Sequence, residues 1–158
     1  MANAITLEFE KGQLESIVKD LDKLFPDSDT KLRTTLRSAM RKSAVPLRTE
    51  IRTQIDRIKP ATNSKNPERD TGQLKKSIGI INGKSKGGRK PSVYVGPRVK
   101  GAYATETKTG FYFYFHEYGF NGTPGLRMLD AAAQSKGAEV MNNFVGKLET
   151  IIAKRFAK

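Results

Sequence analysis

Apolar side chains recur every three or four residues through the first part of the chain, which is the spacing of amphipathic helices. A first helix is predicted over about residues 11–24. The segment DSDT at 27–30 offers Asp and Ser N-caps to a second helix that runs to about Lys59. Pro46 lies inside this second pattern and removes a backbone donor, so we expect the helix to kink or restart near Ala44. The apolar residues of the second helix are Leu32, Leu36, Met40, Leu47, Ile51, Ile55 and Ile58.

The pattern changes after this helix. Residues 60–72, PATNSKNPERDTG, hold turn-formers and charges without periodicity, and we expect a mobile loop there. Three apolar runs of strand type follow: LKKSIGII, which ends at about Asn82, SVYVG at 92–96, and FYFYFHEYG at 111–119. Helical spacing returns from Gly125 onward. The residues of this last stripe are Leu126, Leu129, Ala133, Val140, Phe144, Leu148 and Ile151, widened by Met141, Val145 and Ile152.

The order of these elements predicts an α+β fold, with long helices packed on a small three-stranded antiparallel sheet and a long C-terminal helix. The chain of 158 residues suits a single domain. Its expected parts are a helical N-terminal part at 1–59, the sheet at 73–119 and the C-terminal helix at 125–157.

The aromatic run at 111–119 is the most unusual part of the sequence. Strand alternation separates two faces, Phe111, Phe113, Phe115 and Glu117 on one, and Tyr112, Tyr114, His116 and Tyr118 on the other. The Phe face is the expected core face, and Glu117 should lie past the sheet edge or pair with an arginine, because an unpaired buried carboxylate is too costly. The tyrosine face suits either a partner or the C-terminal helix of the same chain. We therefore take Tyr112, Tyr114, Tyr118, His116 and Glu117 as candidates for contacts between subunits.

Charge is unevenly distributed along the chain, whose formal net charge is +13. Residues 1–28 carry three basic and six acidic groups, a net of −3, whereas residues 29–59 carry nine basic and three acidic groups, a net of +6. Such a balance favours an acidic partner, either nucleic acid or an acidic protein surface. The two segments therefore offer surfaces of opposite charge, or else are two solvated helix faces.

Five arginines of the second helix form what we call the arginine row: Arg33, Arg37, Arg41, Arg48 and Arg52. The first three follow one another at every fourth residue, and the last two repeat that spacing after Pro46. The row can contact phosphates without reading base sequence, dock on an acidic protein surface, or only solubilise the helix. A basic loop adds Lys84, Lys86, Arg89 and Lys90. Its glycines lack the P-loop spacing, so a solvated hairpin connection is the simpler interpretation.

The sequence gives little support to catalysis. It has no cysteine, and its single histidine, His116, has no flanking serine or glycine elbow. His116 and Glu117 point to opposite faces if they lie in a strand, so they cannot serve one substrate together. We therefore expect no enzymatic activity, no metal and no cofactor. No apolar run approaches the roughly 20 residues of a membrane span, and the start of the chain lacks the pattern of a signal peptide, so we expect a soluble protein without a membrane partner.

Four segments together resemble a known family. They are TGQLKKSIGI at 71–80, VYVGP at 93–97, FYFHEYG at 113–119, and the glycine and proline turn NGTPGLRMLDAAAQ at 121–134 that leads into the last helix. In this order they resemble the tail-completion or neck proteins of long-tailed bacteriophages, the gene-product-ten-like minor structural proteins. The resemblance covers about residues 30–156. One departure is at 125–129, where this chain has Gly-Leu-Arg-Met-Leu and the family usually has a proline followed by Phe-Leu-Arg-Pro-Ala.

The resemblance implies a virion protein made in the bacterial cytoplasm and assembled as a ring at the head–tail junction, around the passage for double-stranded DNA. Six-fold symmetry is the first expectation, because tail tubes in the resembled family have it. The implied partners are further copies of this chain and other neck, connector and tail-tube proteins, with nonspecific contact to double-stranded DNA as an additional possibility. The alternative function is that of a basic protein that binds nucleic acid without sequence specificity. The sequence shows neither a helix-turn-helix nor an RNA-type aromatic motif, so base recognition is not expected.

Overall fold

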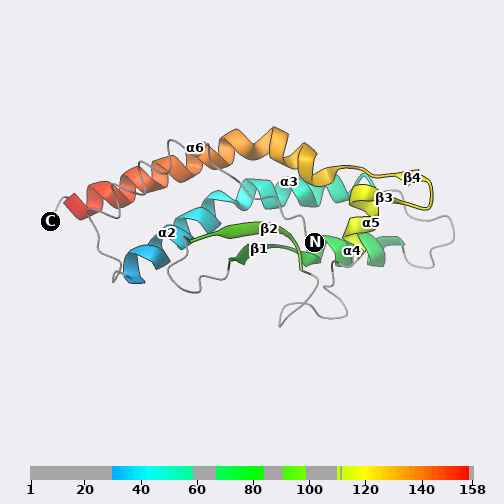
Figure 1. Cartoon of the computed structure of the whole chain (residues 1–158), viewed down its shortest axis with the longest axis horizontal. Coiled ribbons are helices and arrows are strands. Elements are labelled where there is room, and N and C mark those ends of the chain that lie inside the picture. Colours follow the sequence, from blue (N-terminus) through cyan, green and yellow to red (C-terminus); the bar gives the residue numbers. More distant parts are fainter. Residues whose placement is uncertain (1–29, 59–66, 84–90, 99–109, 111, 157–158) are drawn as a thin grey trace.

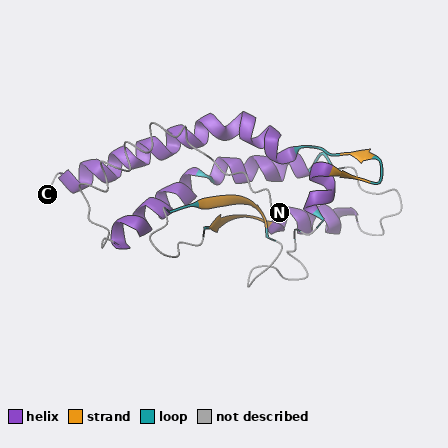
Figure 2. Ribbon diagram, in the orientation of Figure 1, coloured by secondary structure: helices purple, strands orange, loops and turns teal. Residues whose placement is uncertain are grey.

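The computed structural model describes residues 30–58, 67–83, 91–98, 110 and 112–156. Three layers are visible in Figure 1 and, by element type, in Figure 2. A bent helical layer made of α2 (Thr30–Ser43) and α3 (Val45–Ile55) runs through the middle. The long helix α6 (Met128–Phe156) covers one side of it, and the hairpin of β1 (Ile78–Asn82) and β2 (Val93–Pro97) covers the other. The α+β class expected from the sequence is confirmed.

The predicted break in the second helix is confirmed at its predicted place. Ala44 separates α2 from α3, and Pro46 lies in the first turn of α3, where a missing N–H removes no helical hydrogen bond. The Ala44 N–H still donates to the Met40 carbonyl at 3.0 Å, so the two helices remain joined through the bend. The small side chains of Ser43 and Ala44 are both buried at this bend. The helix ends at Ile55, a few residues before the predicted end.

The core lies between the bent helix, α6 and the hairpin. Leu47, Ile51 and Ile55 of α3 are fully buried, as their spacing predicted. A second, smaller cluster at the far end of α6 contains Phe144 and Leu148 with Ala39 of α2. The main cluster consists of Ala44, Leu47, Ile51, Ile55, Ile58, Leu74, Ile78, Ile80, Val95, Phe113, Met128, Leu129, Ala132 and Val140.

The start of α6 differs from the prediction. The helix begins at Met128 rather than Gly125, because Arg127 has a φ of 48°, a left-handed conformation that a right-handed helix cannot contain. Leu126 is therefore outside the helix and 42% exposed. Val145, expected to widen the buried stripe, is exposed instead, since it lies on the flank of α6 that points away from α2 and α3.

Two of the three expected strands are present, and one loop prediction is wrong. Helix α4 (Pro67–Ser77) occupies the second half of the expected loop at 60–72 and the first half of the expected strand LKKSIGII. Proline suits the first turn of a helix, and Leu74 and Ser77 turn inward to be buried, the latter donating to the Leu74 carbonyl at 2.6 Å. The strand begins only at Ile78 and pairs with Pro97 at that end of the antiparallel ladder.

The third expected strand is a helix. Residues Phe113–Tyr118 form α5, so the main sheet has two strands within the described ranges and this run is not its third, and the two aromatic faces of a strand do not exist. A second, very short pair follows, β3 (Gly119–Phe120) and β4 (Thr123–Pro124). The segment is helical despite its strand propensity, because α5 places Phe113 in the core and Glu117 at the start of α6.

The helix predicted at 11–24, the N-cap segment before Thr30, Phe111 and the basic loop with Lys84, Lys86, Arg89 and Lys90 lie outside the described residues. None of the helices in the described part of the chain combines the length and apolar character needed to cross a membrane.

Candidate functional site: an aromatic end and an arginine row

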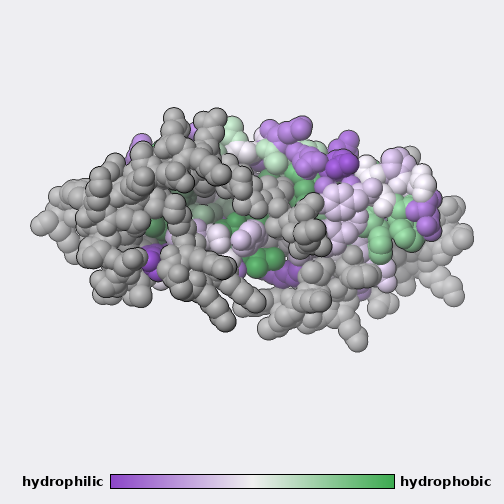
Figure 3. Space-filling view, in the orientation of Figure 1, coloured by the Kyte–Doolittle hydropathy of each residue, from purple (hydrophilic) through white to green (hydrophobic). Residues whose placement is uncertain are grey.

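A group of exposed apolar side chains lies at the end of the molecule that carries α5 and the β3–β4 hairpin. We call it the aromatic end and define it as Tyr112, Phe115, Tyr118, Phe120 and Leu126, which are 61%, 36%, 44%, 56% and 42% exposed. In Figure 3 this end of the molecule shows apolar side chains in green beside polar ones in purple. Scattered apolar residues are normal on a surface, but a contiguous group marks an interaction surface.

Three rings of the aromatic end contact one another, and the fourth, Tyr118, contacts residues beside it. Phe115 lies 4.9 Å from Phe120 and 6.0 Å from Tyr112, centroid to centroid, both in tilted arrangements. Tyr118 stacks parallel to Tyr114 at 6.2 Å, and the Arg127 guanidinium lies 5.9 Å from its centroid. Rings held by neighbours keep their conformation before a partner arrives, which lowers the entropic cost of binding.

The backbone that presents Phe120 is a tight hairpin. Asn121 and Gly122 have φ angles of 48° and 78°, and positive φ at both central residues is what a two-residue type I′ turn requires. Gly119, with a φ of 91° and a ψ of 161°, adopts a conformation open only to glycine. A Cβ at Gly119 would also overlap the Thr123 carbonyl. The sequence Tyr-Gly-Phe-Asn-Gly therefore fixes where Phe120 projects.

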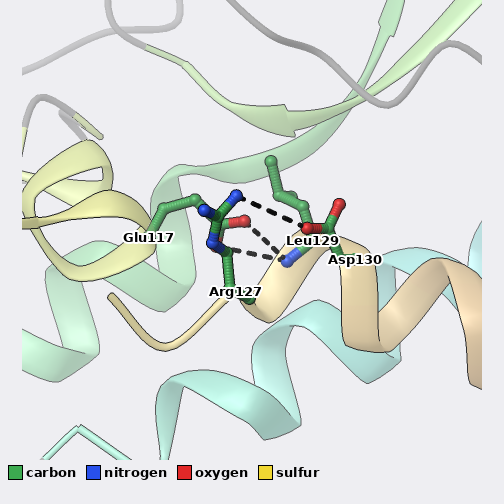
Figure 4. Close-up of polar contacts among 4 residues, drawn as sticks. All are labelled: Glu117, Arg127, Leu129 and Asp130. Carbon is green, nitrogen blue, oxygen red and sulfur yellow. Dashed lines mark hydrogen bonds and ion pairs between the residues drawn. The ribbon is translucent and has the colours of Figure 1, made fainter. Parts of the chain in front are cut away.

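Glu117 joins α5 to α6, as Figure 4 shows. Its carboxylate is 1% exposed, and both oxygens accept the Leu129 N–H, each at 3.2 Å. Its main-chain carbonyl accepts the Arg127 N–H at 3.2 Å. The first amides of a helix have no partner within the helix, so a carboxylate from a distant element satisfies them and complements the helix dipole. Glu117 is thus neither at a sheet edge nor paired with a distant arginine, as the strand prediction required.

Burial is the main electrostatic effect at Glu117. Burial raises the pKa of this carboxyl, while the N–H groups of Leu129 and Met128 act in the opposite direction. Asp130 raises the pKa further and Arg127 lowers it. The adjacent His116 has a pKa lowered by burial. Burial thus shifts the pKa of Glu117 upward and that of His116 downward. Both carboxylate oxygens of Glu117 are used in hydrogen bonds to the start of α6.

The arginine row does not form one free surface. Arg41 Nη1 donates to the Ile80 carbonyl at 3.1 Å and to Asn82 Oδ1 at 2.9 Å, and Arg52 Nη2 donates to the Ile78 carbonyl at 2.9 Å. Because Ser77 and Gly83 hydrogen bond toward β2, the alternate carbonyls of residues 78 and 80 point to the opposite edge of β1. Two members of the row therefore lie on the edge of β1 that faces away from β2. Sequence spacing alone shows no sign of this contact, since it joins segments about 25 to 40 residues apart.

The other row members are placed differently. Arg33, Arg37 and Arg48 are half-buried on the bent helix. Whether the row or the tyrosines contact another subunit stays a prediction. Phe115, Phe120 and Leu126 were missed as surface candidates, and the prediction that Phe115 lies on the core face is wrong, because α5 turns this ring outward. The Asn-Gly turn after Phe120 was the signal that could have identified Phe120. Within the described ranges, no group of three or more His, Cys, Asp or Glu side chains is arranged to hold a metal ion.

A family model with the description "Bacteriophage HK97-gp10, putative tail-component" matches residues 15–119, about two thirds of the chain. The chain belongs to the HK97-gp10-like family. The match ends at Gly119, so it includes α2 to α5 with Glu117 and leaves out α6 and all of the β3–β4 hairpin after Gly119. No curated protein and no solved structure matches the chain.

Membership of the HK97-gp10-like family confirms the resemblance based on the four sequence segments. This protein is a structural component of a bacteriophage tail and not an enzyme. The carboxylate of Glu117 accordingly has a structural explanation, because it accepts the Leu129 N–H at the start of α6.

Proposed function

We propose that this HK97-gp10-like protein is a neck or tail-completion component that forms a ring at the head–tail junction of the virion. The ring surrounds the passage for double-stranded DNA and consists of several copies of one domain, with six-fold symmetry as the first expectation. Its other partners are the connector and tail-tube proteins on either side. The chain is made in the bacterial cytoplasm and joins the particle during assembly.

The aromatic end is the observation that carries this proposal. Five of the seven large apolar residues that are exposed in the described chain belong to it, and they lie at one extremity of the molecule. Aromatic side chains are enriched in the cores of protein interfaces. When this surface contacts a different surface of the next copy, the contact is head-to-tail and generates a ring if the rotation closes.

The alternative, a free nucleic-acid-binding protein, receives less support. A phosphate-binding row needs cations that project into solvent, whereas Arg41 and Arg52 are hydrogen bonded to main-chain carbonyls of β1. Binding of a DNA duplex through charge alone would also leave the exposed rings of the aromatic end without a role.

The experiment compares two substitutions of exposed apolar residues. Phe120→Ser removes a central side chain of the aromatic end, and Val145→Ser removes an exposed side chain of comparable accessibility on α6. Both variants should unfold at urea concentrations close to that of the wild type, because surface substitutions usually change stability by less than about 0.5 kcal/mol. Only Phe120→Ser should lower the yield of joined heads and tails, counted by electron microscopy.

A density map of the joined particle provides the second measurement. The expected result is a ring of copies on the particle axis, with α5 and the hairpin of each copy against its neighbour. A single copy away from the axis would overturn the proposal. Normal particle yield with Phe120→Ser would show that the aromatic end has another role.

A further inference from the structure

The smaller apolar cluster lies between α2 and α6, at the end of the molecule opposite the aromatic end (Figure 1). We call it the far cluster. Its three buried members are flanked by Leu36 and Met40 of α2 and by Ile151 of α6, which are only half-buried. Apolar surface that stays in contact with water adds nothing to stability until another element covers it. An apolar element placed over these three side chains would complete the far cluster.

The segment that precedes α2 is well placed to do so. The sequence predicts a helix over residues 11–24, which lie outside the described residues, and only residues 25–29 separate this helix from Thr30 at the start of α2. Two antiparallel helices joined by about two to five residues form a common hairpin. Five extended residues span at most about 17 Å, which exceeds the roughly 8–10 Å between the axes of packed helices. The range 11–24 has the same length as α2, 14 residues, so a helix folded back on α2 would pass Leu36 and Met40.

The predicted helix also has the apolar side that this position requires. Its apolar residues recur at every third or fourth position and therefore lie on one side of the helix. They are Leu14, Ile17, Val18, Leu21 and Leu24. An isolated helix of about 14 residues is only marginally stable in water, so it needs another element against which to bury this side.

Charge and the family match favour the same arrangement. Helix α2 contains five basic residues and no acidic residue, whereas residues 1–28 have a net charge of −3. Opposite charges on neighbouring helices attract each other, which adds to the apolar contact. The family model matches from residue 15 onward, so most of the predicted helix belongs to the part of the chain that the HK97-gp10-like family shares.

We propose that residues 11–24 form an amphipathic helix that folds back on α2 of the same copy and covers Leu36, Met40 and Ile151. The short connection favours the same copy, because it holds the segment near its own α2 at a high effective concentration. With the far cluster covered, apolar contacts to a partner are left to the aromatic end. The contact lies within one copy, so it does not depend on the ring proposed above.

The test measures how fast a maleimide reagent labels single cysteines in the full-length protein. The chain contains no cysteine of its own, so each labelled thiol reports one position. Leu36→Cys and Ile151→Cys place a thiol at the far cluster, one on each helix. Ser38→Cys is the matched exposed position on α2. Mass spectrometry follows the labelling, and circular dichroism confirms that each variant is folded.

Each cysteine variant is compared with and without Ile17→Ser and Leu21→Ser, which remove apolar side chains from the predicted helix. A thiol reacts faster when it is more exposed, so labelling of Leu36→Cys and Ile151→Cys should become roughly fivefold faster or more. Labelling at the exposed position on α2 should change by less than about twofold, because nothing covers it in either protein.

A polar substitution in the same segment is the matched control. Lys19→Ser, on the opposite side of the predicted helix from the apolar residues, should leave every labelling rate unchanged. If the variant with both Ile17→Ser and Leu21→Ser does not fold, Ile17→Ala alone is compared by the same measurement. Equal labelling of Leu36→Cys with and without these apolar substitutions would overturn the inference.

Two further measurements identify what covers the far cluster. A contact within one copy does not depend on protein concentration, so the rate at Leu36→Cys should stay constant on a dilution of about a hundredfold. A rate that rises on dilution would show that a second copy supplies the cover, and would overturn the inference. Phe120→Ser should also leave this rate unchanged. Faster labelling in that variant would identify the aromatic end of another copy as the occupant, which again overturns the inference.

Discussion

Replacing Glu117 should destabilise the fold more than replacing any exposed carboxylate. The side chain is 1% exposed, and its two oxygens accept the Leu129 N–H at the start of α6. Glu117→Ala removes the cap, which costs about 1 kcal/mol, and leaves a buried donor without an acceptor, which costs roughly 1–3 kcal/mol more. The free energy of unfolding should therefore fall by about 2–4 kcal/mol in total.

The matching variants separate shape from charge. Glu117→Gln keeps one acceptor oxygen in the same place, so its cost should be about 1 kcal/mol or less at neutral pH. Glu149→Gln removes an exposed carboxylate from α6 and should change the stability by less than about 0.5 kcal/mol. Urea unfolding followed by far-UV circular dichroism measures all three. If Glu117→Ala unfolds at the same urea concentration as Glu149→Gln, the carboxylate does not hold the start of α6.

The pH dependence gives an independent check. Burial raises the pKa of Glu117 in the folded protein, so the folded state holds this proton more tightly than the unfolded chain does. The resulting contribution to stability is fully present below the unfolded pKa of about 4.3 and is lost as the pH rises through the raised folded value. Because Gln does not titrate, the stability difference between wild type and Glu117→Gln should shrink as the pH rises above about 4.3, the unfolded pKa. A difference that grows with pH would contradict this argument.

Three further substitutions test separate parts of the structure. Phe144→Ala should lower the free energy of unfolding by roughly 3–5 kcal/mol, since this side chain is only 6% exposed. Val145→Ala, on the exposed flank of α6, should change this free energy little. Similar values for both variants would place Phe144 outside the core. Gly119→Ala should reduce stability by more than about 1 kcal/mol, because its φ of 91° suits only glycine, and wild-type thermal unfolding would show that this turn relaxes. Arg41→Gln, which loses two hydrogen bonds to β1, should lower the free energy of unfolding by about 1–2 kcal/mol. Lys42→Gln should leave it unchanged in the same urea titration. Equal values for the two variants would show that the bonds of Arg41 to β1 do not stabilise the fold.

The sequence by itself determined the long elements. The bent helix and α6 carry apolar residues at every third or fourth position over many turns. Only a helix places residues at this spacing on one side, where the core can bury them together. Pro46 fixed the position of the bend, because its missing N–H is tolerated only in the first turn of a new helix. The four ordered segments also sufficed to identify the family.

The spacing of apolar residues did not predict the short elements. Helix α4 buries Leu74 but few other apolar side chains, so it shows no repeat that distinguishes it from a loop. The run at 111–119 has the composition of a strand, and nothing local opposes that assignment. The arginine row likewise shows its spacing in the sequence but not its acceptors, which belong to a strand about 25 to 40 residues away.

Only the tertiary structure decided these cases, and it did so through contacts between distant segments. Helix α5 forms because Phe113 fills the core and Glu117 meets the unpaired amide of Leu129, two gains that an extended strand at the edge of β2 would not provide. The same turn of chain leaves Phe115, Phe120 and their neighbours exposed together at one end. A local pattern records how a side chain repeats along its own element, but the partner of a buried carboxylate or of a guanidinium is set by where the other elements pack.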